Sequence, residues 1–198
     1  MSSKCEKWGY KVEDAKDLYV VLFISRNKDN RDIPNFKERR RSFVTTKKPY
    51  ELTEEFHHFV EDAVDGEICR MYYSVNVRDA KKVRKELIKF LVDDDNFNIA
   101  HLGGKIAGIA ASKECAATKR WMFDFDENDN KSIYNFVSDI RNIDPSLIPT
   151  AYRTPNGYAV IVEHGFDTRW LMEKWGKVAT LKRDDLLCYK WSQKDESI

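Results

Sequence analysis

Hydrophobic residues in this chain fall into short runs separated by polar segments, and the spacing within each run predicts the element that it forms. β-Branched and aromatic residues typical of strands fill residues 18–25, 69–76 and 120–126, and two predicted hairpins pair 151–153 with 157–163 and 178–182 with 186–191. Apolar residues three or four positions apart predict helices over 52–64, 79–91, 101–116, 132–140 and 167–175. The charged stretch 26–41 is expected to be a loop.

The order of these elements indicates the fold class. Strands alternate with helices in the first part of the chain and cluster in the second, which is typical of an α+β protein with a mainly antiparallel sheet and helices packed on a face. We expect a single domain over residues 1–198, with a loose segment at about 1–16 and a polar tail at about 192–198. The strand at 120–126 is expected to be central, because it is rich in large apolar residues: Trp121, Met122, Phe123 and Phe125.

Composition excludes several classes of protein. The 198 residues include 34 basic and 33 acidic side chains, a formal net charge of +1, so any nucleic-acid-binding surface has to be local. No apolar run approaches the roughly 18 residues of a membrane-spanning helix, and the first residues lack the apolar core of a signal peptide. The cysteines are too far apart for a zinc motif or a disulfide framework, so free thiols and a cytoplasmic location are expected: Cys5, Cys69, Cys115 and Cys188.

A pair of carboxylates is the strongest candidate for chemistry. Asp124 and Asp126 are two positions apart on a predicted strand and therefore point to the same face, while Phe123 and Phe125 point to the core. Two adjacent carboxylates repel each other unless a divalent cation lies between them, and Mg²⁺ or Mn²⁺ takes such ligands together with a substrate's phosphates. The alternative is an acidic strand end that faces solvent.

Two turns could add further polar groups. The turn at 153–157 combines Arg153 and Thr154 with Asn156 and Gly157, and a tight turn of this kind lets backbone amides approach a phosphate. In the last hairpin, Asp184 or Asp185 could complete a carboxylate site. Ordinary hairpin turns explain both segments equally well. Polar residues 25–28 also stand at the end of the first strand, but the pattern assigns them no specific chemistry.

Taken together, the Phe-Asp-Phe-Asp strand, the Thr-Pro-Asn-Gly-Tyr turn and the late acidic residues resemble the archaeo-eukaryotic primase superfamily, or primase-polymerases. The resemblance spans roughly residues 70–191 and implies an RRM-like sheet. It further implies that Asp124 and Asp126 bind the metal, that Thr154, Asn156 and Gly157 face nucleotide phosphates, and that Asp184 or Asp185 is the third catalytic carboxylate. The chain also resembles small phage proteins in general character rather than in motifs.

One position departs from the family's pattern. The family has a histidine about two residues after the turn glycine, where this chain has Ala159, and His164 lies on the opposite face by parity. This departure favours a nucleic-acid- or nucleotide-binding protein with degenerate catalysis. An active metal-dependent nucleotidyltransferase using Asp124 and Asp126 is the first alternative, and a non-catalytic interaction or inhibitor protein is the second.

A basic run supplies a candidate nucleic-acid contact. Arg39, Arg40 and Arg41 are consecutive and could bind phosphates, although a solvated surface explains such a run as well. The expected partners are therefore nucleic acid or a nucleotide, with a host protein as a further possibility and no membrane.

Overall fold

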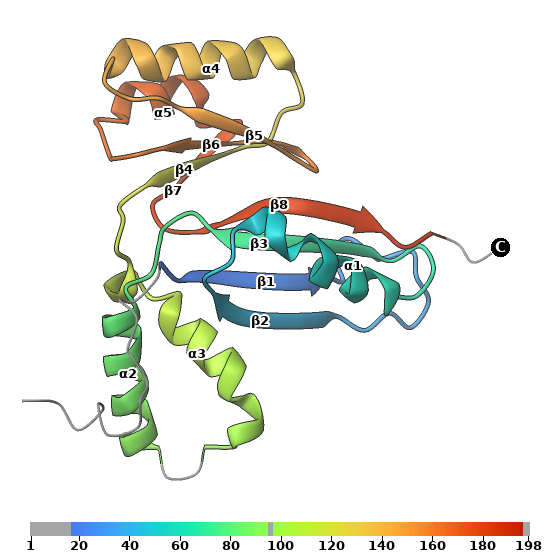
Figure 1. Cartoon of the computed structure of the whole chain (residues 1–198). Helices are drawn as coiled ribbons and strands as arrows, with labels where there is room; N and C mark the ends of the chain where they lie inside the picture. The colour runs from blue at the N-terminus through green and yellow to red at the C-terminus, as the bar shows by residue number, and fades with distance from the viewer. Residues whose placement is uncertain (1–16, 95–96, 196–198) are drawn as a thin grey trace, which may run out of the picture.

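The computed structural model describes residues 17–94 and 97–195, and within them the chain is an α+β protein with two antiparallel four-stranded sheets (Figure 1). The predicted fold class is confirmed. The segment expected to be loose, residues 1–16, lies outside the described residues. Of the cysteines, Cys69, Cys115 and Cys188 are free and buried, while Cys5 lies outside the described residues.

The first sheet has the strand order β2-β1-β3-β8. Its strands are β1 (Tyr19–Ser25), β2 (Arg39–Thr45), β3 (Ile68–Ser74) and β8 (Leu186–Gln193). Helix α1 (Thr53–Glu61) covers one face, where Phe23, Phe56 and Met71 are almost completely buried. Helices α2 (Ala80–Asp93) and α3 (Leu102–Ala110) pack together at one end of this sheet (Figure 1).

The second sheet has the order β5-β6-β4-β7. Its strands are β4 (Trp121–Phe125), β5 (Thr150–Thr154), β6 (Gly157–Val162) and β7 (Ala179–Lys182), and α4 (Asn130–Ile143) and α5 (Arg169–Trp175) cover its outer face (Figure 1). Phe123, Phe125 and Phe136 have no exposed surface and form the centre of this core. The prediction that the 120–126 strand is central is confirmed.

Two expectations about strands were wrong. The expected charged loop at 26–41 ends too late, because residues 39–41 begin β2, which pairs along its whole length with β1. The predicted hairpin at 178–191 does not exist, because β7 pairs with β4 in the second sheet and β8 pairs with β3 in the first. The chain crosses between the sheets at residues 183–185, and β8 continues to Gln193, inside the expected polar tail.

A buried polar network fastens the two sheets together at these crossings. Arg78 donates two hydrogen bonds of 2.8 Å to the carboxylate of Asp184, and Asn76 donates a third, of 3.1 Å. Asn76 also donates to the carbonyl of Arg120 and accepts from the Arg120 amide and the Thr118 hydroxyl. The chain passes between the sheets twice, from β3 to β4 and from β7 to β8, and this network joins the two connections.

The sheets also share a small apolar core. Val75 and Leu187 from the first sheet pack against Met122 and Ala159 from the second, and all four are buried. Within the described residues, no helix combines the length and the apolar character that crossing a bilayer requires.

Candidate functional site

A cleft of about 430 Å³ lies between the two sheets. The face of the first sheet opposite α1 forms one wall, and the inner face of the second sheet forms the other. The polar and charged side chains that line it come from both sheets: Arg26, Lys28, Arg70, Tyr72, Asp124, Asp126, Thr154, Asn156, Lys182 and Asp185. The cleft thus has a wall rich in cations facing a wall rich in carboxylates.

The carboxylate wall is built by β4. Its alternation buries Phe123 and Phe125 against α4 and turns Asp124 into the cleft, as the sequence predicted. Asp126, just after the strand, lines the same cleft, and the Asp126 amide donates to the carbonyl of Val178 at 2.7 Å. Two carboxylates therefore converge on one space from adjacent same-face positions.

The surroundings of Asp124 disfavour its charged form. Burial raises the pKa of the Asp124 carboxyl, the charges of Asp126 and Asp185 raise it further, and Lys182 opposes them. Neither Asp124 nor Asp126 forms an ion pair with another described residue, whereas Asp185 approaches Lys182 at 3.9 Å. A cation in the cleft would relieve this repulsion.

The opposite wall carries three cations: Arg26 and Lys28 from the loop after β1, and Arg70 from β3. Arg70 is only 8% exposed, its Nη2 donates to Asp29 at 2.6 Å, and its Nε has no hydrogen-bond partner among residues 17–94 and 97–195. Arg26 donates to the same Asp29 carboxylate at 2.8 and 3.1 Å. Asp29 therefore holds both guanidinium groups in place, and an unsatisfied Arg70 N–H is left beside the cleft.

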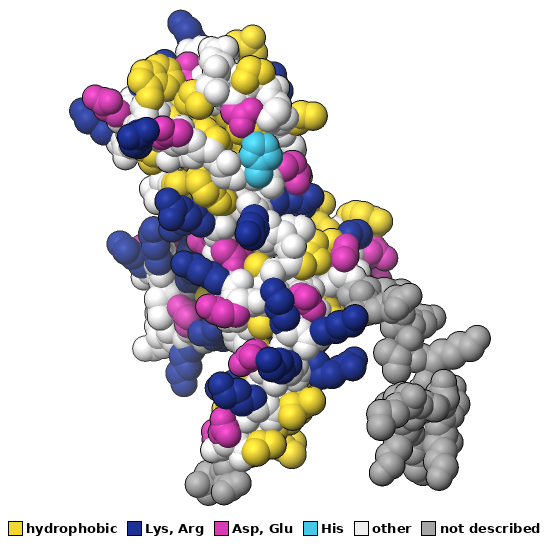
Figure 2. All heavy atoms as spheres, turned by 90° about the vertical axis from the view of Figure 1, so that its left-hand side faces the viewer, with side chains coloured by type: hydrophobic (Ala, Val, Ile, Leu, Met, Phe, Trp, Pro, Cys, Tyr) yellow, Lys and Arg dark blue, Asp and Glu magenta, His cyan; other side chains and the backbone are white. Residues whose placement is uncertain are grey.

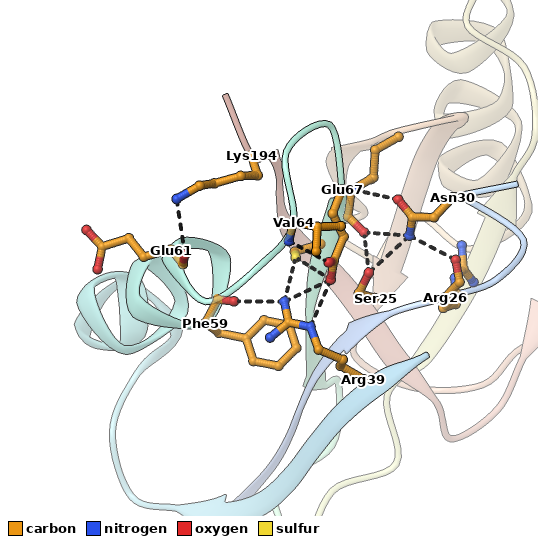
Figure 3. A network of polar contacts seen from close by, with 11 residues as sticks. Ser25, Arg26, Asn30, Arg39, Phe59, Glu61, Val64, Glu67 and Lys194 are labelled. Atoms are coloured by element: carbon orange, nitrogen blue, oxygen red, sulfur yellow. Dashed lines mark hydrogen bonds and ion pairs between the residues drawn. The ribbon is translucent and has the colours of Figure 1, made fainter. Parts of the chain in front are cut away.

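A buried network fixes the loop that presents these cations (Figure 3). The Asn30 side-chain amide donates to Ser25 Oγ, to the Arg26 carbonyl and to the Ile68 carbonyl, at 2.9–3.1 Å. Its oxygen accepts from the Ile68 amide at 2.6 Å. The loop after β1 is thereby tied to the start of β3, and Arg26 and Asp29 keep a fixed position at the cleft.

The predicted turn contributes in part. Thr154 and Asn156 line the cleft, as expected of phosphate-facing groups. Arg153 does not, because it pairs in register with Tyr158 on the opposite face of the sheet and donates to the Tyr158 hydroxyl at 2.9 Å. Gly157 is absent from the lining; a Cβ there would lie 2.0 Å from the carbonyl oxygen of Phe125, so close backbone packing explains the glycine.

Asp184 also lies elsewhere than expected. The sequence analysis offered it as a third catalytic carboxylate, yet its side chain is 8% exposed and is engaged by Arg78 and Asn76, outside the cleft lining. Asp185, its neighbour, lines the cleft instead. The strand crossing at 183–185 turns the two side chains in different directions, which the expected hairpin did not reveal.

The basic run at 39–41 is divided by strand alternation. Arg39 faces the α1 side, where its guanidinium donates to the buried Glu67 at 2.8 and 3.0 Å and lies 4.6 Å from the Phe59 ring (Figure 3). Arg41 lies over Phe43, 5.3 Å from the ring. Arg40 pairs in register with Ile24, which faces the cleft. The three arginines therefore do not form one patch.

Metal-binding geometry is limited to the aspartate pair. No group of three or more His, Cys, Asp or Glu side chains is arranged to hold a metal within residues 17–94 and 97–195. Oxygen ligands from one or two carboxylates suit Mg²⁺ or Mn²⁺, which keep several waters and complete their coordination with substrate phosphates. Asp124 and Asp126 fit that pattern, since no described cation neutralises either of them within ion-pair distance.

Of the cations that line the cleft, the sequence indicated those within residues 25–28 without a specific chemistry, and Arg70 and Lys182 were not predicted. In β3, Arg70 and Tyr72 alternate with the buried Cys69, Met71 and Tyr73, and this alternation was a readable signal of a polar face within an apolar strand. Lys182 gave no such signal, because its position depends on β7 pairing with β4.

Comparison of the sequence with protein-family models and with curated proteins, and of the structure with solved structures, found no match.

Proposed function

We propose that the cleft between the sheets binds the phosphate groups of a nucleotide or of a nucleic-acid end, together with a divalent cation, in a protein whose catalysis is degenerate. The observation that carries this proposal is the opposition of two unpaired carboxylates, Asp124 and Asp126, to the buried Arg70 with its unpartnered Nε. The resemblance to primase-polymerases, stated from the motifs, supports the same function.

Phosphate fits the cationic wall. Arg26 and Lys28 follow the end of β1 and line the cleft. Arg70 adds the Nε–H donor, which is buried away from water and is therefore costly to leave without an acceptor. A phosphate oxygen accepts such charge-assisted hydrogen bonds strongly. A ligand without an acceptor at this position would leave the Arg70 Nε donor unsatisfied.

The divalent cation fits the other wall. Asp124 and Asp126 would hold Mg²⁺ or Mn²⁺, and the ion would neutralise charge on the phosphates when bound. A bound cation would also offset the repulsion between the two carboxylates, which by itself raises the pKa of Asp124. Thr154 and Asn156 supply neutral polar groups at the margin of the same space.

The degenerate character rests on Ala159. This residue pairs in register with Asp124 and is 2% exposed, so a methyl group occupies the position where the resembled family has histidine. A methyl group can neither donate to a phosphate nor move a proton. Binding should therefore persist while nucleotide transfer is weak.

Isothermal titration calorimetry with dATP and MnCl₂ tests this function. We expect unmodified protein to bind dATP in the presence of Mn²⁺, Asp124→Asn to weaken binding about tenfold or more, and Lys28→Gln to weaken it by roughly threefold to tenfold, because each removes one charged contact. Glu163→Gln is the matched control, because Glu163 is 62% exposed, lies outside the cleft and pairs with Arg120 on the surface.

Two results would contradict the proposal. The absence of dATP binding at millimolar concentration by folded, unmodified protein would remove the nucleotide site. Equal losses in Asp124→Asn and Glu163→Gln would show that the cleft carboxylate is not involved. Robust primer extension by the unmodified protein would instead favour the active nucleotidyltransferase and overturn the degenerate part.

A further inference from the structure

A second groove, of about 510 Å³, lies between the edge strand β2 and the beginning of α3. Three of the described residues that line it are cations, Arg40, Arg41 and Lys105, and none of the described acidic residues lines it. This composition is unusual for the molecule, because the chain has nearly equal numbers of acidic and basic residues. On the side shown in Figure 2, for example, Lys and Arg side chains are interspersed with Asp and Glu.

The groove and the cleft share one face of the first sheet. Arg40 on β2 pairs with Ile24 on β1, which pairs with Arg70 on β3, so all three residues lie in one row across the sheet. Neighbouring strands are about 4.8 Å apart, which places the backbone of Arg40 about 10 Å from that of Arg70. Ser42 and Leu22 form the next position of the same two strands. A ligand in the groove therefore lies next to the cleft.

The cations of the groove are available for a ligand. Arg40 is exposed and forms no ion pair with another described residue. Lys105 lies over the Phe90 ring, 3.8 Å from its centroid, and Phe90 in turn packs edge-on against Phe97, which lines the groove. The groove thus combines positive charge with an aromatic ring.

We infer that this groove binds the backbone of a single-stranded nucleic acid and directs it towards the cleft. The inference rests on the proposed function, since it supplies the strand whose end the cleft would hold. Positive charge without carboxylates attracts phosphates, and an aromatic ring in the groove offers stacking to unpaired bases, which a duplex does not present. The shared sheet face supplies the path between the two sites.

Adjacent glycines in the first turn of α3 provide a matched test. A Cβ on Gly104 would lie 3.7 Å from Ser42 Oγ, an ordinary contact at the groove, whereas a Cβ on Gly103 would meet nothing within 4 Å. Both positions are exposed. Gly104→Glu therefore places a negative charge in the groove, and Gly103→Glu adds the same charge to the same helix turn outside the groove lining.

The assay is fluorescence anisotropy with a labelled oligothymidylate of about 20 nucleotides, measured at several salt concentrations. We expect Gly104→Glu to lower affinity about tenfold and Gly103→Glu to change it less than threefold. Arg40→Gln should lower affinity and reduce the salt slope by about one. Calorimetry with dATP and Mn²⁺ on both glutamate variants should match the unmodified protein, which separates the groove from the cleft.

Three outcomes would overturn the inference. The first is an unmodified protein that binds dATP but not the oligonucleotide, and the second is an equal effect of the two glutamate substitutions. The third is equally strong competition by polyglutamate of similar charge, which would indicate a general site for acidic polymers such as acidic protein segments. If the unmodified protein does not bind dATP, that result contradicts the proposed function and not the inference about the groove.

Discussion

Replacing Asp184 with asparagine should destabilise the fold strongly while sparing the cleft. The side chains of Arg78 and Asp184 are 1% and 8% exposed, and they share two hydrogen bonds of 2.8 Å. Asparagine keeps the shape but removes the charge, which leaves the Arg78 guanidinium buried without a counter-ion. Breaking a buried pair in this way costs about 3–5 kcal/mol.

Urea unfolding followed by circular dichroism measures this loss directly. A loss of that size corresponds to a fall in Tm of roughly 6–20 °C for a chain of this length. Asp185→Asn is the control, because it is the next residue, is 45% exposed and only approaches Lys182 at 3.9 Å. The Asp185 carboxylate also accepts from the Leu186 amide at 2.8 Å, and an asparagine oxygen can accept the same hydrogen bond. We therefore expect Asp185→Asn to change the free energy of unfolding by less than about 1 kcal/mol.

The reasoning would be refuted if Asp184→Asn changed the free energy of unfolding no more than Asp185→Asn does. If Asp184→Asn were stable but had lost metal-dependent dATP binding, Asp184 would instead act in the binding site as a third carboxylate. The network of Asn76, Arg78 and Asp184 would then not be the fastening between the sheets.

Three further predictions follow from individual contacts. Because burial and Asp126 raise the pKa of Asp124 above its ordinary value of 3.8, the folded state holds the Asp124 proton more tightly than the unfolded chain does. The contribution of Asp124 to stability should therefore fall as pH rises from about 4 through the raised pKa; in thermal melts the Tm of the unmodified protein should fall over this range relative to that of Asp124→Asn, and a constant difference between the two would contradict this. Gly157→Ala should lower the free energy of unfolding by more than about 2 kcal/mol, since its Cβ would lie 2.0 Å from Phe125 O; a neutral result in urea unfolding would refute the packing explanation. Asn30→Ala should destabilise the chain by about 2–3 kcal/mol, because it leaves the buried Ile68 amide without its 2.6 Å acceptor, and hydrogen exchange at Ile68 should accelerate; unchanged exchange there would count against the network.

The parts of the fold that the sequence predicted are those with strong local periodicity. The large apolar residues at 121–123 and 125 predicted the central position of β4, and the alternation of Phe and Asp over 123–126 predicted the shared face of Asp124 and Asp126.

The pairing of the strands could not be predicted from local sequence patterns, because it depends on contacts between distant segments. β7 and β8 are separated by three residues and look like the arms of a hairpin, but Leu181 packs with the second core and Leu187 with the apolar contact between the sheets. The start of β2 was assigned to the preceding loop because three arginines fill its first positions, and an edge strand of this kind has little apolar surface to reveal it. The division of the strands into two sheets, and hence the cleft, depends on these long-range pairings.

Binding of Mn²⁺ followed by electron paramagnetic resonance tests the central claim most directly, because the signal of free Mn²⁺ falls as the ion binds. For the unmodified protein, measured without dATP because triphosphates themselves chelate Mn²⁺, the account predicts one Mn²⁺ bound per chain in the cleft, with affinity reduced about tenfold or more in Asp124→Asn and unchanged in Glu163→Gln. Unaltered Mn²⁺ binding in the double variant Asp124→Asn, Asp126→Asn would contradict the account.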